Sequence, residues 1–105
     1  MHIPIYTIFK SHKASPNEHE ILPDGWTHGA MDGSTCWETA EGVKRALDLR
    51  YDLMKKGCAS VARPIPIKNT LKIDENGIVE GAIYYKYLGV EYQCWVAQLI
   101  LMKNN

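Results

Sequence analysis

One helix signal followed by strand patterns limits the folds that are open to this chain. Thr35 and Glu38 have the spacing of a capping box, in which each side chain accepts a hydrogen bond from the other residue's backbone amide. Gly57 is the residue type that most often ends a helix. The sequence therefore predicts a helix over residues 35–56.

The apolar residues of this helix recur at helical spacing, so they form a single stripe. The stripe consists of Trp37, Ala40, Val43, Leu47, Tyr51 and Met54. Charged residues such as Glu41, Lys44 and Asp48 occupy the opposite side. A helix with one apolar side must bury that side against another element. We therefore expect it to pack on one face of a sheet.

Strand patterns lie on both sides of the helix. Apolar residues alternate over residues 3–9 before it, and over 65–73, 78–88 and 91–102 after it. Asn76-Gly77 and Gly89 mark tight turns between the later strands. Pro64 and Pro66 favour a sheet edge, because proline has no amide hydrogen to donate. The last strand is apolar on both faces, so we expect it to be central.

These elements predict an α+β fold in one domain over residues 1–105. The expected architecture is an antiparallel sheet of about four strands, in the sequence order β-α-β-β-β, with one long helix packed on one face. Residues 10–34 form a long loop. A loop of that length without structure is uncommon in a compact domain, so we expect a short extended segment around Trp26 to Ala30.

Charge and hydropathy exclude several function classes. The chain has 12 basic and 12 acidic residues, which argues against nucleic-acid binding because that affinity is largely electrostatic. No apolar run is long enough to span a bilayer, and no signal peptide is visible. Three cysteines do not make an even disulfide framework. We therefore expect a cytoplasmic protein that has reduced thiols and no membrane contact.

Cys36 is the sharpest candidate for catalysis. It lies in the first turn of the predicted helix, where free amides and the helix dipole make a thiolate more available. Residues 33–37, Gly-Ser-Thr-Cys-Trp, resemble the nucleophile segment of papain-like cysteine proteases, which carry their histidine after the cysteine. Here all four histidines precede it. The resemblance implies Cys36 as nucleophile. A permuted arrangement would then use His28 or His19 as base and Asp24 as the group that orients the base.

The histidines also raise the question of a metal site. His12, His19, His28, Asp24 and Cys36 are spaced too widely to form the compact ligand pairs of structural zinc sites. There is no glycine-rich phosphate loop and no dinucleotide fingerprint. The sequence therefore predicts neither a metal site nor a cofactor.

Aromatic residues around the last turn are the candidate binding surface. Tyr84, Tyr87, Tyr92 and Trp95 flank Gly89. Exposed Tyr and Trp are favoured in recognition surfaces, because they supply a large contact area at low entropy cost. We expect these four residues to contact a partner.

The sequence thus favours a binding protein over an enzyme. We expect a small cytoplasmic protein–protein interaction module, such as an inhibitor, an immunity factor or an accessory protein of phage or mobile-element type. Its partner would be a host or cognate protein, or a second copy of the chain in a homodimer. The alternative is a small cysteine-dependent enzyme with Cys36 as nucleophile and His28 or His19 as base.

Overall fold

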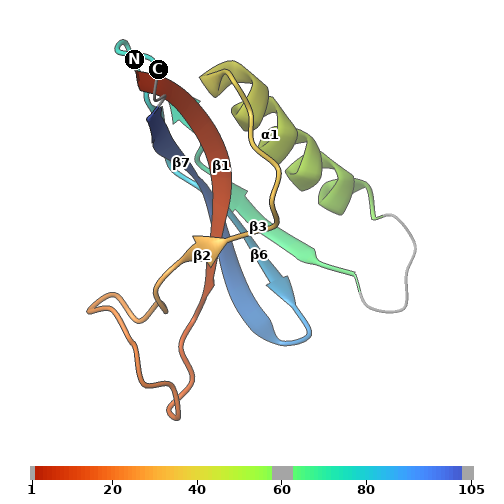
Figure 1. Ribbon diagram of the computed structural model, residues 1–105. Coiled ribbons are helices and arrows are strands. Elements are labelled where there is room, and N and C mark those ends of the chain that lie inside the picture. The colour runs from red at the N-terminus through yellow and green to blue at the C-terminus, as the bar shows by residue number, and fades with distance from the viewer. Residues whose placement is uncertain (1, 58–62, 103–105) are drawn as a thin grey trace.

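The computed structural model describes residues 2–57 and 63–102 and confirms the α+β class. One helix lies across one side of an antiparallel five-stranded sheet (Figure 1), and a separate two-stranded sheet is present besides. The main sheet has the order β2-β1-β7-β6-β3, formed by Ala30–Met31, His2–His12, Val90–Met102, Ile83–Tyr87 and Ile65–Asn69. The small sheet contains β4 (Lys72–Ile73) and β5 (Val79–Glu80), and the helix is α1 (Ala40–Lys56).

The two longest strands form the centre of the sheet. β1 and β7 pair antiparallel along the whole of β1, from His2 opposite Met102 to His12 opposite Tyr92. The prediction that the last strand is central is confirmed, since β7 lies between β1 and β6. β3 lies at the edge, as its prolines predicted. β1 runs farther than the predicted residues 3–9, because β7 continues beside it.

The predicted strands over 65–73 and 78–88 are each divided in two. Gly81 has a φ of 85°, and a Cβ at this position would overlap the carbonyl oxygen of Thr70. Only glycine tolerates this close approach, which turns the chain between β5 and β6. The Thr70 hydroxyl also accepts a hydrogen bond from the amide of Ala82 at 3.0 Å. As a result, β4 and β5 form their own hairpin, closed by the predicted turn at 74–77.

The helix begins later than the capping box predicted. α1 starts at Ala40, and the Thr39 hydroxyl accepts a hydrogen bond from the amide of Gly42 at 3.0 Å. The prediction of Thr35 as N-cap is wrong because the chain before Thr39 is held on the sheet: Trp37 and Tyr6 exchange two backbone hydrogen bonds of 2.8 Å. The helix ends at Gly57, as predicted, where φ is 67°.

The core lies between α1 and the sheet face that it covers, here called the helix face. Strand residues on this face alternate with residues on the opposite face, here called the open face. The buried cluster consists of Ile8, Val43, Leu47, Ile83, Tyr85 and Cys94. Tyr6, Trp37, Tyr51, Met54, Leu71, Tyr87, Tyr92 and Val96 pack around it. The predicted helix stripe is therefore the buried side of α1, although Trp37 reaches the core from outside the helix.

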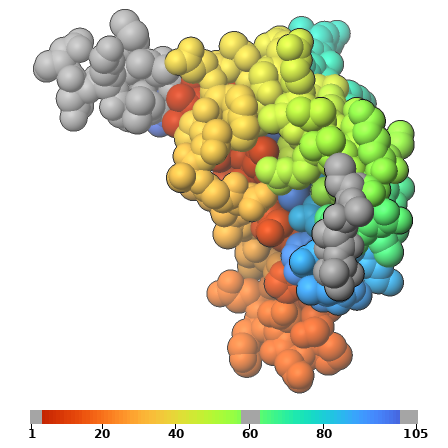
Figure 2. Space-filling view, turned by 90° about the vertical axis from the view of Figure 1, so that its right-hand side faces the viewer, coloured from red at the N-terminus to blue at the C-terminus, as the bar shows by residue number. Residues whose placement is uncertain are grey.

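Residues 13–29 extend past the sheet as a lobe, shown in orange in Figure 2. Isolated bridges join Lys13 to Trp26 and Ile21 to Thr27, so the predicted long loop contains extended backbone around Trp26. The paired strand that follows is β2. Trp26 is only 9% exposed and anchors the lobe. Within the described residues, no helix has the length and apolar character that a membrane span requires.

The position of the helix start can be tested with two threonines. Thr39→Ala removes the capping hydroxyl, and we expect the free energy of unfolding to fall by about 1 kcal/mol. Thr35→Ala is the matched control, because Thr35 bonds to Thr7 through its carbonyl oxygen, which alanine keeps. Urea denaturation measures both. A larger loss for Thr35→Ala would place the cap at Thr35 instead.

Candidate functional site

The residues of the predicted catalytic site are not brought together. Cys36 is exposed and lies in the segment between β2 and α1, next to the pairing of Trp37 with Tyr6. His12 lies about 20 Å farther along β1 than Tyr6, given the rise of a strand residue. His19 and His28 line a hollow together with His12, and Cys36 is not part of that lining. The described structure therefore places neither of the proposed bases, His28 and His19, at Cys36.

Asp24 has a structural role in the lobe. Its carboxylate accepts a hydrogen bond from the backbone amide of Trp26 at 3.1 Å. Its carbonyl oxygen accepts one from the Lys13 ammonium at 3.3 Å. Such a bond from an Asp side chain to the backbone two residues on shapes a turn. The contacts of Asp24 thus fix the fold of the loop, and none of them orients a histidine.

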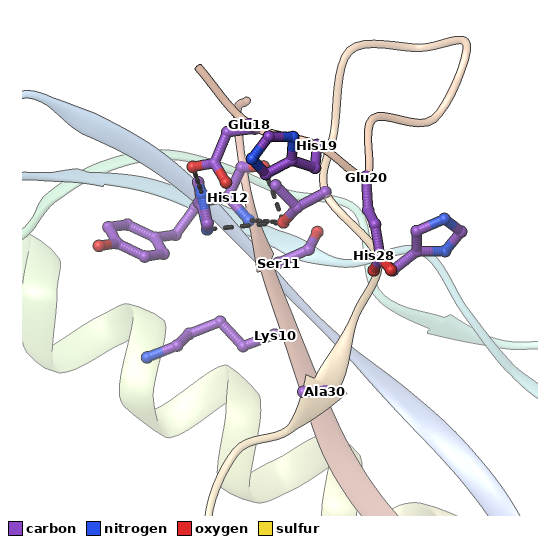
Figure 3. A pocket seen from close by; sticks show the side chains of 10 residues that line it. Lys10, Ser11, His12, Glu18, His19, Glu20, His28 and Ala30 are labelled. Carbon is purple, nitrogen blue, oxygen red and sulfur yellow. Dashed lines mark hydrogen bonds and ion pairs between the residues drawn. The ribbon is translucent and has the colours of Figure 1, made fainter. Parts of the chain in front are cut away.

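Three of the four histidines, His12, His19 and His28, line a hollow of about 400 Å³ between β1 and the lobe (Figure 3). His12 Nε2 lies 2.8 Å from Glu18 Oε1, and His12 Nδ1 lies 3.5 Å from the Thr27 hydroxyl. The same hydroxyl accepts from the backbone amide of His12 at 3.2 Å and donates to its carbonyl oxygen at 3.3 Å. In Figure 3, His28 and His12 lie on opposite sides of β1. The contacts of His12 therefore fasten the lobe to the strand.

The structure brings no metal-binding cluster together within the described ranges. No three His, Cys, Asp or Glu side chains there are close enough to share an ion. Two ligands alone do not make a structural zinc site, which is almost always four-coordinate. The His12–Glu18 contact is thus an ion pair or hydrogen bond, according to the charge on the imidazole.

The four predicted partner-binding residues lie on two different faces. The pairing of β6 with β7 sets Tyr85 opposite Tyr92 and Tyr84 opposite Gln93. Tyr87 and Tyr92 are consequently on the helix face, where they pack against the core cluster. Tyr92 stacks on Tyr85 with 5.4 Å between the ring centroids. Tyr84 and Trp95 are on the open face, so the four residues do not form one contiguous patch.

Two further aromatic residues join Tyr84 and Trp95 on the open face. The Trp95 ring lies 6.0 Å from Phe9, and the Tyr84 ring lies 6.0 Å from Trp26. We call Phe9, Trp26, Tyr84 and Trp95 the open-face aromatic surface. Trp95 also lies directly against Gly29, where a Cβ would overlap its ring. Sequence reasoning did not include the half-buried Phe9 in the candidate surface, and its neighbours on this face, Thr7 and Ser11, are themselves buried.

Two hollows adjoin the open-face aromatic surface. The first, of about 390 Å³, lies against Tyr84 and Trp95 and is closed by Leu22 and Val79. The second, of about 450 Å³, lies at the end of the sheet next to the turn between β6 and β7. Its lining is Lys13, Ala14, Ser15, Ile67, Lys86, Gly89, Val90 and Glu91. Recesses beside aromatic rings are the places where a partner's anchor side chains bind in protein interfaces.

The helix face holds a polar cluster that is structural. The Arg50 guanidinium lies 2.8 Å from the Asp32 carboxylate and ties α1 to the segment after β2. Cys94 is fully buried, with its sulfur 3.8 Å from the Tyr85 hydroxyl. Burial raises the pKa of the Cys94 thiol and the pKa of the Tyr85 phenol, so both groups are neutral at physiological pH.

No family model, curated protein or solved structure matches this chain. The function therefore has to follow from the described surfaces and clusters themselves.

The two described cysteines differ in exposure, and this difference gives a direct test of the site geometry. We expect N-ethylmaleimide to label Cys36 rapidly in the native protein, because this thiol is exposed. Cys94 should react only after unfolding, since it is buried and its pKa is raised. Peptide mapping by mass spectrometry separates these sites from Cys58, which lies outside the described residues. Rapid labelling of native Cys94 would contradict the packing of the helix face.

Proposed function

We propose that this protein is a protein–protein interaction module that binds its partner through the open face of the sheet. It acts in the cytoplasm as an inhibitor, an immunity factor or an accessory protein of phage or mobile-element type, on a host or cognate protein. The observation that carries this proposal is the one-sided cover of the sheet (Figure 1). The helix buries one face, while Tyr84 and Trp95 on the other remain partly exposed.

The partly exposed rings are suited to recognition. Trp and Tyr are enriched among the residues that dominate binding energy, particularly where they adjoin pockets. Trp95 and Tyr84 both line the hollow of about 390 Å³. A partner side chain in this hollow would contact both rings and lose its water on binding. Such desolvated central contacts carry most of the affinity of an interface.

Trp95 is also held in place before any partner arrives. Its ring rests against Gly29 and lies 6.0 Å from Phe9. Ordering a free side chain on binding costs about 0.5–1.5 kcal/mol, and a ring fixed in advance avoids part of that cost. The absence of a Cβ at Gly29 is what leaves room for this packing. Trp95 is therefore the residue that we expect to contribute most to binding.

The proposed surface differs from the one around the last turn that the sequence predicted. Tyr87 and Tyr92 pack against the core cluster on the helix face, and Phe9 and Trp26 are the aromatic neighbours of Trp95 and Tyr84 on the open face. The cysteine-dependent alternative gains no support, because Cys36 lies next to the pairing of Trp37 with Tyr6, while His19 and His28 line the hollow at His12, farther along β1. The inhibitor, immunity or accessory role rests on analogy among small binding domains.

The proposal is tested by affinity capture from a lysate of the source cells. The bait is the tagged protein, and its variant is Trp95→Ala. Leu49→Ala is the matched control, since Leu49 is a large apolar residue that is 56% exposed on α1. We expect Leu49→Ala to retain the partner of the wild-type protein, and Trp95→Ala to bind it at least about 30-fold more weakly, a loss of about 2 kcal/mol.

Circular dichroism and urea denaturation verify that both variants are folded. A folded Trp95→Ala protein that keeps the same partner at full affinity would refute the open face as the binding surface. Sedimentation equilibrium identifies a second copy as the partner. A concentration-dependent dimer that Trp95→Ala dissociates would make the protein a homodimer that uses this face.

A further inference from the structure

Three lysines stand on the open face beside its aromatic rings. The Lys68 ammonium lies 4.7 Å from the centre of the Tyr84 ring, and the Lys13 ammonium lies 5.1 Å from the centre of the Trp26 ring. The two rings lie 6.0 Å apart, so they are flanked by positive charge at both ends. Lys86 follows Tyr84 by two residues on β6 and therefore points to the same face.

Two of these lysines line the hollow at the end of the sheet. Lys13 and Lys86 line this hollow together with Ile67 and Val90. Glu91 is the one carboxylate among the residues that form the lining. The hollow thus combines an apolar surface with two ammonium groups, and Lys68 adds a third close by on β3. This composition is suited to a ligand that has both an apolar side chain and negative charge.

Lys13, Lys68 and Lys86 form no ion pair with an acidic side chain of the described structure, unlike several other basic residues. Asp32 forms ion pairs with Lys10 and Arg50, Asp48 with Lys44, and Glu80 with Lys72. No ion pair involves Lys13, Lys68 or Lys86 within residues 2–57 and 63–102. All three side chains are exposed. The open face therefore presents three ammonium groups that no described ion pair engages, with Glu91, opposite Lys86 in the β6–β7 ladder, as the one carboxylate of the hollow's lining.

We propose that the partner presents an acidic segment to this part of the open face. This inference rests on the proposed function and specifies the chemistry of the partner. An apolar side chain of the segment enters the hollow between Ile67 and Val90, and neighbouring carboxylates contact Lys13, Lys68 and Lys86. Charges arranged in this way steer association and select against partners of the wrong charge.

An acidic protein segment fits the charge distribution better than a nucleic acid does. The chain as a whole carries 12 basic and 12 acidic residues, so it has no net positive charge to attract a polyanion. Nucleic-acid binding depends on neutralising many phosphates along a strand. A short peptide with a few carboxylates needs only the three lysines. The rings between the lysines supply the apolar contact area that a peptide side chain uses.

The test uses a display library of random peptides selected against the wild-type protein. Selected peptides are then measured by fluorescence anisotropy against Lys68→Gln/Lys86→Gln. The matched control is Lys55→Gln/Lys56→Gln, which removes the same charge from the last turn of α1. We expect the selected peptides to carry Asp or Glu beside an apolar residue. Their affinity should fall about tenfold in the open-face variant, change little in the control, and weaken with added salt.

The outcomes separate this inference from the proposed function. One outcome would be peptides that contain no acidic residues, bind Trp95→Ala more weakly and bind Lys68→Gln/Lys86→Gln as tightly as the wild-type protein. This outcome would overturn the acidic partner and leave the open-face proposal intact. Peptides that bind both variants as tightly as the wild-type protein, or a selection that yields no binder, would count against the acidic partner and against the open-face proposal. A single-stranded oligonucleotide, labelled with a fluorophore, is the third probe. Tight binding that Lys68→Gln/Lys86→Gln abolishes would replace the acidic segment with a nucleic acid.

Discussion

The pairing of β1 with β7 is the interaction on which the rest of the structure depends. The two strands stay in register along the whole of β1, from His2 opposite Met102 to His12 opposite Tyr92. This ladder joins the two ends of the described chain and sets which side chains face the helix. Because side chains alternate along a strand, a slip of β7 by one residue against β1 would exchange the two faces of β7. It would carry Cys94 out of the core and bring Trp95 in, while Ile8 on β1 stayed in place. The core and the open-face aromatic surface are thus two consequences of one register.

The single described helix explains why the two faces differ. α1 buries Ala40, Val43 and Leu47 against the helix face, and its position is fixed by contacts outside the helix itself. The segment before it pairs with β1 through Trp37 and Tyr6, and Arg50 binds Asp32. One helix covers only one face of a sheet. On the open face, the lobe of residues 13–29 reaches as far as Trp95 through Gly29 and leaves hollows beside the aromatic rings. Because the sheet is covered on one face only, we propose that a partner binds the open-face aromatic surface.

The sequence predicted the features that depend on local patterns and missed those that depend on distant contacts. The apolar stripe of the helix, its stop at Gly57 and the central position of the last strand are confirmed. Thr35 failed as the cap because the competing pairing of Trp37 with Tyr6 joins residues far apart in the chain. The break at Gly81 depends on Thr70, another distant contact. The alternation of Tyr84 and Tyr87 was visible in the sequence, but which of them faced the core depended on where the helix packs. The gathering of His12, His19 and His28 follows from the hydrogen bonds of Thr27 to β1, which no spacing reveals.

The most direct test of a sheet that is covered on one face and accessible on the other is solvent paramagnetic relaxation in the free protein. A neutral gadolinium chelate, added to protein labelled in its aromatic and methyl groups, broadens the signals of groups that the solvent reaches. The structure predicts more broadening at the partly exposed Trp95 and Tyr84 than at the buried Ile8, Leu47 and Tyr85. Equal protection of both sets in the monomer would contradict the arrangement, because it would mean that the open face is already buried within the chain.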